Sequence, residues 1–323
     1  LASCSSQEGS RSAAEFYSDA PLSAAAAAPQ IDRSGGYEVQ TEEMYFESSG
    51  GRVYAVLYYP SAEETARPAV IFSHGYGGTH RSGGSYAEAL ASQGYIVCCP
   101  DFRGGGPDSR SDGSTLDMTV FTELDDLETV LAALYERDDV DKSNIFLMGN
   151  SQGGVVSALA AVRHVDEIAG MVLSSPAFSM SDDARRMFES TDAVPETYEY
   201  MQMTVGRGYF TSIMDYDLYA AVSGYDGPVL IFHGDGDTLV PISYSERAAD
   251  TLPNASLEVL RGEGHIYSQA AVQRVIEMLS GFFAEHLRAS QAPDAGRQTG
   301  LVAEQILNGD TGEIHYSYYL PEG

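Results

Sequence analysis

Residues 145–163 read IFLMGNSQGGVVSALAAVR, and this stretch decides the fold. The apolar run Ile145–Met148 predicts a buried strand, and Val155–Arg163 predicts a helix. Between them, GNSQG at 149–153 fits the pattern G-x-S-x-G, in which a serine occupies a strained turn from strand to helix and glycines let the backbone fold tightly. The helix N-terminus directs backbone N–H groups toward charge that develops there. The motif therefore predicts a nucleophile at Ser151.

Strands and helices alternate on both sides of this stretch. Runs that are too short for a helix and apolar on both faces predict buried parallel strands at Ala69–Phe72, Tyr95–Cys99, Asn144–Met148, Gly170–Leu173 and Pro228–Phe232. Apolar residues at helical spacing predict a helix over Phe121–Tyr135, and residues 44–59 predict a hairpin around Ser49-Gly50-Gly51. This alternation predicts an α/β fold with a doubly wound, mostly parallel sheet.

The same pattern divides the chain into three parts. Residues 1–36 are rich in Ser and Ala and are expected to form a flexible tether. The strand and helix pattern covers residues 37–288, with an insertion at about 176–226 that is too long for a simple connection. Insertions of this length are usually functional lids or decoration. Residues 289–323 read as a linker followed by a strand-like tail.

A serine hydroxyl is a poor nucleophile unless a base removes its proton, so a histidine is expected after Ser151. Of seven histidines, three follow both the serine and a plausible acid: His265, His286 and His315. His265 closes the sequence GEGH just after a strand-like run. His286 is expected inside a helix, facing solvent, and His315 lies in the tail. The sequence therefore predicts His265 as the base.

The acid that orients this histidine is expected in the segment HGDGDTLVP at 233–241. The segment follows a predicted strand, at the carboxyl edge where open α/β sheets bind ligands. A buried carboxylate at the far ring nitrogen holds the imidazole tautomer and stabilises the imidazolium. Asp237 is the preferred residue, and Asp235 is the alternative.

The segment SHGYGG at 73–78 follows another predicted strand and is rich in exposed backbone. Backbone N–H groups that point at a developing oxyanion stabilise the tetrahedral intermediate, and each donor contributes roughly 3–4 kcal/mol. We assign the oxyanion hole to the N–H groups of Tyr76 and Gln152, and we expect His74 to orient the loop. The alternative is a glycine loop with no special role.

Composition excludes several other classes of protein. The chain has 323 residues with 18 Lys+Arg against 47 Asp+Glu, and its net charge of −29 makes nucleic acid an implausible partner. Its 43% of hydrophobic residues exclude global disorder. No His/Cys cluster has metal-ligand spacing, so neither a metal nor a cofactor is expected. Cys98 and Cys99 are expected to be buried free thiols that point to opposite faces of a strand.

The segments SHGYGG, DFRGGG, GNSQGG, HGDGDTLVP and EGH resemble the α/β-hydrolase superfamily in order and spacing, from Tyr37 to about Arg288. The order Ser, Asp, His is that of these enzymes. DMTV at 117–120 with Glu123 and Asp126, together with GNSQGGVV and GRGYF at 206–210, most resembles bacterial cinnamoyl (feruloyl) esterases.

This resemblance implies a catalytic triad of Ser151, Asp237 and His265. It also implies that the insertion is a lid that closes over an aromatic acyl group, with Tyr209 as a substrate contact. One position departs from the pattern, since Asn150 stands where many relatives carry His beside the nucleophile.

The expected function is that of a serine carboxylic-ester hydrolase that forms an acyl-enzyme with hydroxycinnamoyl, aryl or short acyl esters. A serine peptidase of the aminopeptidase kind is an alternative, because fold and triad do not separate amides from esters. A non-catalytic binding module with this fold is the alternative from another class. The insertion carries aromatic and Met side chains that suit a planar acyl group or pack on the core: Tyr198, Tyr200, Met201, Met203, Tyr209, Met214, Tyr216 and Tyr219.

The first four residues, Leu1-Ala2-Ser3-Cys4, resemble the lipobox of bacterial lipoproteins. That resemblance implies a lipid on Cys4 and an extracytoplasmic protein that meets the membrane only through this anchor. The polar stretch that follows would serve as its tether.

The tail contains GEIHYSYYLP at 312–321, a strand-like run that repeats features of residues 51–60 at an offset of 261. An isolated strand is not stable. Either this run adds to the edge or surface of the domain, or it is the opening strand of a second, similar domain in a longer protein.

Overall fold

The protein is described by a computed structural model that covers residues 31–32, 35–61, 66–290, 304–309 and 312–317. An eight-stranded sheet in the order β1-β2-β4-β3-β5-β6-β9-β10 organises the unit formed by residues 27–291. Its strands are β1 (Val39–Ser48), β2 (Gly51–Pro60), β3 (Arg67–Ser73), β4 (Ile96–Pro100), β5 (Val140–Asn150), β6 (Ile168–Ser174), β9 (Val229–Gly234) and β10 (Ala255–Leu260). Within this sheet, the β1–β2 and β2–β4 pairs are antiparallel and the other five pairs are parallel, so the predicted mostly parallel sheet is confirmed.

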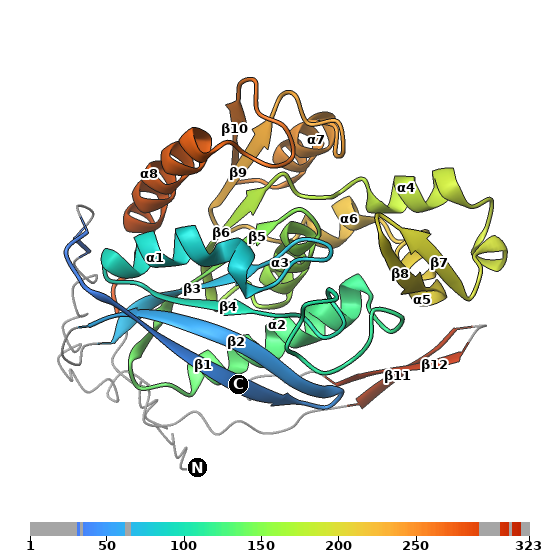
Figure 1. Ribbon diagram of the computed structural model, residues 1–323, viewed down its shortest axis with the longest axis horizontal. Coiled ribbons are helices and arrows are strands. Elements are labelled where there is room, and N and C mark those ends of the chain that lie inside the picture. The colour runs from blue at the N-terminus through green and yellow to red at the C-terminus, as the bar shows by residue number, and fades with distance from the viewer. Residues whose placement is uncertain (1–30, 33–34, 62–65, 291–303, 310–311, 318–323) are drawn as a thin grey trace, which may run out of the picture. The chain divides into compact units, whose positions relative to one another are not determined.

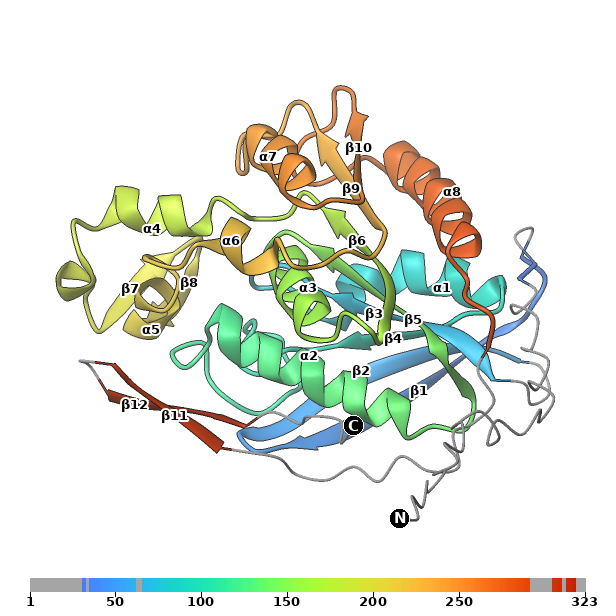
Figure 2. The ribbon, with the colours of Figure 1, turned by 180° about the vertical axis from the view of Figure 1, so that it is seen from behind.

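Helices cover both faces of this sheet, as Figures 1 and 2 show from opposite sides. On one face, α1 (Gly84–Ser92) and α8 (Gln269–Glu285) pack on one apolar cluster. On the other face, α2 (Val120–Tyr135), α3 (Gln152–Arg163) and α7 (Ser243–Thr251) contribute to a second cluster. Both faces of the central strands are therefore buried, which explains why their sequences are apolar without alternation.

Two smaller expectations can be compared with this core. Cys98 belongs to one apolar cluster and Cys99 to the other, and both are free thiols. The prediction of buried thiols on opposite faces is confirmed. The prediction that His286 lies inside a helix is wrong by one residue, because α8 ends at Glu285 and His286 is its C-cap. The His286 ring lies edge-on to Phe282, with the ring centroids 4.6 Å apart.

The insertion, residues 176–226, lies between β6 and β9 where it was predicted, and it has secondary structure of its own. It contains α4 (Met180–Met187), a 3₁₀ turn (Thr191–Ala193), β7 (Thr197–Tyr200), β8 (Met203–Gly206), α5 (Arg207–Thr211) and α6 (Leu218–Val222). Figure 1 shows α4, β7, β8 and α5 gathered beside α6, at one end of the sheet. Many of its apolar side chains are buried in the same cluster as those of α2 and α3.

The described part of the other unit is a hairpin. Its strands are β11 (Glu304–Gly309) and β12 (Gly312–Ser317), which pair with each other in a two-stranded sheet. The predicted strand at 312 is therefore present, and it pairs with β11. The pair at the hairpin tip, Gly309 and Gly312, corresponds to the tip pair Ser48 and Gly51 at the same offset of 261. The second similar domain stays a prediction.

Candidate active site

Ser151 occupies the sharp turn between β5 and α3. Its backbone has φ 53° and ψ −120°, a conformation that residues with a side chain rarely adopt. The turn is held on both sides, because the Ser151 N–H donates to Ser174 O at 2.9 Å and its carbonyl accepts from the N–H groups of Gly154 and Ala177. The serine side chain is thus fixed at the carboxyl edge of the sheet.

The glycines of the motif are required by close backbone contacts. A Cβ on Gly153 would lie 2.2 Å from Ser73 O and 2.4 Å from His74 O. A Cβ on Gly149 would lie 2.1 Å from the carbonyl oxygen of Gly153. Real Cβ atoms do not approach backbone atoms so closely, so α3 can start beside β3 only if these positions lack a side chain.

Gly153→Ala is expected to destabilise the fold by roughly 1–3 kcal/mol, because the backbone must shift to admit the methyl group. For a domain of this size, thermal unfolding should show a melting temperature about 3–10 °C lower. Gly208→Ala is the matched control, since its Cβ would meet only Thr119 Cγ2 at 3.5 Å. Equal melting temperatures for the two variants would contradict the steric argument.

Three residues that are far apart in sequence meet at this turn. His265 Nε2 lies 3.0 Å from Ser151 Oγ, and His265 Nδ1 lies 2.7 Å from Asp237 Oδ2. Because a carboxylate oxygen only accepts, Nδ1 carries the proton and Nε2 is left to accept the serine proton. The structure therefore brings together the serine, histidine and aspartate that the sequence predicted, in the geometry of a nucleophile, its base and the group that orients the base.

The two candidate acids have different environments. Asp237 is buried, and its Oδ1 accepts from the N–H groups of Leu239 and Val240 at 2.8 and 2.9 Å. Asp235 is exposed, and its Oδ1 accepts from the N–H of Gly262 at 2.6 Å. Asp235 therefore ties together two loops, while the contact with the histidine ring belongs to Asp237.

A second histidine supports Asp237, and the sequence analysis gave it no role. His233 Nε2 lies 2.9 Å from Val240 O and 3.2 Å from Asp237 Oδ2, and its Nδ1 lies 2.7 Å from Ser245 Oγ. Since Val240 O can only accept, Nε2 donates and Nδ1 accepts. Burial lowers the pKa of His233 and keeps this fully buried ring neutral. The only sequence signal was its place at the head of HGDGD.

The SHGYGG loop lies directly against the nucleophile. A Cβ on Gly75 would lie 3.1 Å from Ser151 Cβ. The buried His74 fixes the loop, because its Nε2 accepts from the N–H of Phe102 at 3.0 Å and its Nδ1 donates to Gly75 O at 2.8 Å. Burial lowers the pKa of His74, which keeps it neutral. Tyr76 follows Gly75 in this loop, and Gln152 follows Ser151 at the start of α3, while their role as oxyanion donors stays a prediction.

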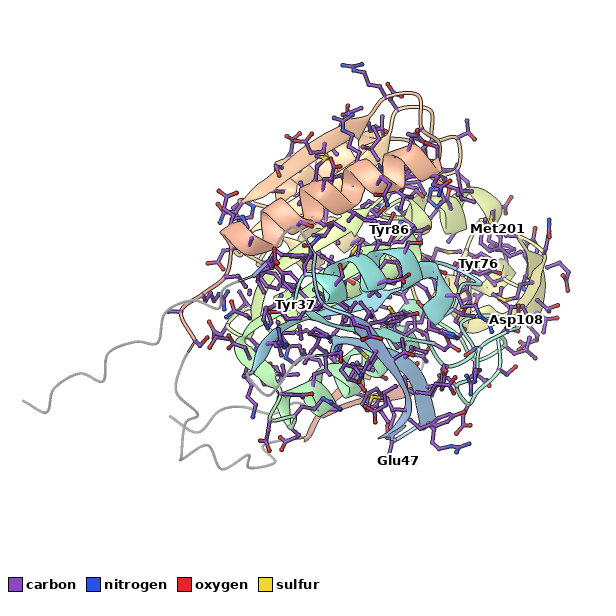
Figure 3. The ribbon with its side chains drawn as sticks, turned by 60° about the vertical axis from the view of Figure 1, so that its left-hand side comes forward. Tyr37, Glu47, Tyr76, Tyr86, Asp108 and Met201 are labelled. Carbon is purple, nitrogen blue, oxygen red and sulfur yellow. The ribbon has the colours of Figure 1, made fainter. Side chains whose placement is uncertain are left out.

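Tyr209 of the insertion lies against Gln152 and Tyr76, whose backbone N–H groups are the predicted oxyanion donors. The Tyr209 hydroxyl donates to Gln152 Oε1 at 2.7 Å, and the Tyr209 and Tyr76 ring centroids are 5.5 Å apart. The Tyr76 hydroxyl donates to Tyr200 O at 2.7 Å. Figure 3 shows Tyr76 and Met201, at the tip of the β7–β8 hairpin, at the same end of the molecule. Burial raises the pKa values of Tyr209 and Tyr76 well above the ordinary range, so both hydroxyls keep their protons.

Two further expectations concern metals and membranes. Among the described residues, no group of three or more His, Cys, Asp or Glu side chains could hold a metal ion. No helix in the described part of the chain is long and apolar enough to cross a bilayer. Cys4 lies outside the described residues, so its lipidation, and with it the extracytoplasmic location, stays a prediction.

Comparisons with known proteins match most of this unit. The model of the family described as "Serine aminopeptidase, S33" matches residues 64–213. Among solved structures, Est1E from Butyrivibrio proteoclasticus with bound ferulic acid superposes with a TM-score of 0.69 at 27% identity, covering 75% of this chain and 98% of Est1E.

Two curated relatives differ in how much of them the chain spans. A monoacylglycerol lipase of Mycolicibacterium smegmatis is 22% identical, over 77% of this chain and 98% of the lipase. The quorum-quenching protein AidA of Acinetobacter baumannii is 27% identical over 42% of this chain, and the match spans 43% of AidA. The chain therefore spans less than half of AidA but nearly the whole length of the lipase and of Est1E.

Proposed function

We propose that this chain, a hydrolase of the α/β-hydrolase fold that resembles feruloyl esterases, is a serine carboxylic-ester hydrolase that works through an acyl-enzyme. The observation that carries the proposal is the pair of contacts that link Ser151 Oγ, the His265 ring and the Asp237 carboxylate. A non-catalytic binding module has no need for this arrangement, and the buried acid and strained serine backbone both have a cost in stability.

The contacts assign a task to each group. His265 Nε2 takes the proton from Ser151 Oγ as the oxygen attacks the ester carbonyl, and the resulting oxyanion lies between the N–H groups of Tyr76 and Gln152. His265 then gives the proton to the leaving alcohol, and an ester bond to Ser151 remains. Water, activated by the same imidazole, attacks this acyl-enzyme and releases the acid.

For the substrate, we propose hydroxycinnamoyl or other aryl esters, with short acyl esters as the broader class. The support is the aromatic group beside the oxyanion donors, in which Tyr76, Tyr200 and Tyr209 have ring centroids 5.4–5.8 Å apart. Aromatic rings at such spacing offer edges and faces to a planar acyl group. Est1E, which was solved with ferulic acid bound, shares the fold at 27% identity.

The second candidate is a serine peptidase of the aminopeptidase kind, and the family match over residues 64–213 favours it. A panel of feruloyl, acetyl and long-chain acyl esters together with aminoacyl amides separates the two. We expect kcat/KM for the feruloyl or acetyl ester to exceed that for any amide by about 100-fold or more, because leaving alkoxides need less help than leaving amines. Faster cleavage of an aminoacyl amide than of every ester would replace the esterase by the peptidase.

A further inference from the structure

Glu123, in the first turn of α2, is a buried carboxyl that the mechanism above does not use. Its side chain is fully buried, and neither carboxyl oxygen makes a hydrogen bond at standard geometry among the described residues. A buried polar group without a partner costs stability, so its presence calls for an explanation. Burial raises the pKa of Glu123 to about 8, and the nearby Asp126 adds to this rise, whereas interaction with the Gln152 carboxamide lowers it.

The Gln152 side chain is the link between this carboxyl and the active site. Its Oε1 accepts from the Tyr209 hydroxyl of the insertion. The one hydrogen bond that its Nε2 makes among the described residues is with the thioether of Met118, with Nε2 and Sδ 3.9 Å apart, and a thioether is a weak acceptor. The amide nitrogen therefore has an unfilled donor beside a carboxyl with unfilled acceptors, and the backbone N–H of the same Gln152 is a proposed oxyanion donor.

We propose that Glu123 is a positioning residue: it holds the Gln152 carboxamide from the core side while Tyr209 holds it from the insertion, and so it fixes the backbone N–H that meets the oxyanion. This inference rests on the proposed ester hydrolysis. A small movement of the carboxamide away from Met118 completes the hydrogen bond with Glu123. A ligand in contact with Tyr209 would shift the same carboxamide through the Tyr209 hydroxyl.

The charge of Glu123 decides whether this arrangement assists the reaction. A neutral carboxyl near Gln152 can accept from its amide without opposing the negative charge on the oxyanion, whereas a carboxylate there opposes it. Two other titratable groups face Glu123: Asp126 on the same helix, which pairs with Arg103, and Tyr209 from α5. Burial raises the pKa of Asp126 to about 6 and that of Tyr209 well above the ordinary range. The alkaline change near pH 8 is therefore assigned to Glu123.

The test compares Glu123→Gln and Glu123→Leu with the unchanged protein, using acetyl and feruloyl esters from pH 6 to 10. We expect the unchanged protein to lose kcat as the pH rises through about 8, and Glu123→Gln to keep its kcat at pH 7 within about threefold but to lack this decline. Glu123→Leu should lower kcat about tenfold with little change in KM for the acetyl ester, as for a partly misaligned oxyanion donor.

Leu127→Ala is the matched control on the same helix, because Leu127 is fully buried in the apolar core and has no part in the proposed mechanism. It should lower the melting temperature and leave both the kcat and the alkaline decline as they are. A merely structural Glu123 would give the same pattern as this control, and an unchanged alkaline decline in Glu123→Gln would overturn the inference.

Thermal unfolding gives a reading that needs no substrate. The folded-state pKa of Glu123 lies above the unfolded value of 4.5, so the native state holds the extra proton between about pH 4.5 and pH 8 and loses stability as the pH rises through this window. Glu123→Gln removes this loss, so its melting temperature should rise relative to the unchanged protein between pH 5 and pH 8. Equal differences at both pH values would contradict a buried, protonated carboxyl and so overturn the inference.

The outcomes also separate this inference from the proposed function. The rate at which a fluorophosphonate labels Ser151 serves as a second readout, since the phosphonyl oxygen occupies the same oxyanion hole. An unchanged protein that neither hydrolyses esters nor takes the label would overturn both ideas. Normal hydrolysis and labelling in the Leu variant would overturn only the role of Glu123.

Discussion

Ser151→Ala is expected to reduce kcat for ester hydrolysis by about 10⁴-fold or more. The substitution removes the hydroxyl that lies 3.0 Å from His265 Nε2, and members of a triad act as a unit, so no other group replaces it. The residual rate would come from the oxyanion donors and from substrate binding. Alanine keeps the Cβ that Ser151 already places in the strained turn, so the melting temperature should stay within about 2 °C.

Ser157→Ala is the matched control, because Ser157 is a buried serine on α3, the helix that follows Ser151, and its hydroxyl has no hydrogen-bond partner among the described residues. It should leave kcat and KM unchanged. Burst kinetics with a chromogenic ester would detect the acyl-enzyme in the control and lose it in Ser151→Ala. Retention of more than about 1% of kcat in Ser151→Ala would place the nucleophile elsewhere.

Asp237→Asn is expected to lower kcat about 10³–10⁴-fold. The amide can present a donor to His265 Nδ1, which favours the tautomer with the proton on Nε2. That nitrogen then cannot accept the serine proton. The loss should be in kcat, with KM little changed, because the carboxylate does not touch substrate in the proposed mechanism. Steady-state kinetics at pH 7 measure it.

Asp235→Asn is the comparison that separates the two candidate acids. Its amide oxygen can still accept from the N–H of Gly262, and this residue does not contact His265. We expect kcat within about threefold of the unchanged protein, as for most exposed substitutions. The reverse ranking of the two variants would assign the acid to Asp235 and contradict the geometry.

The strands and the three residues of the candidate triad could be predicted because local sequence determines them. Central strands are buried on both faces, so runs such as 69–72 and 170–173 are continuously apolar, and the strand, turn and helix around Ser151 leave a glycine pattern. His265 and Asp237 follow from chain order and from their position after strands. These signals do not depend on which distant residues meet.

The remaining features depend on tertiary contacts that leave no local trace. The β7–β8 turn has Met201 and Gln202 at positive φ, where a turn signal would require Gly or Asn. His233 looks like any strand residue until its ring meets Asp237. Glu123 lies on the buried face of its helix, and the Gln152 side chain that it meets there comes from another helix.

The insertion shares one apolar core with α2 and α3, and this continuity bears on how such an enzyme can diversify. A segment with its own core can be exchanged between relatives as a cassette. Here Phe178, Val205 and Phe210 are buried in the same cluster as Leu124 and Leu127, so removal of the segment would open the domain that carries the nucleophile. Substitutions around Tyr209 are therefore constrained by the packing that the insertion shares with α2 and α3.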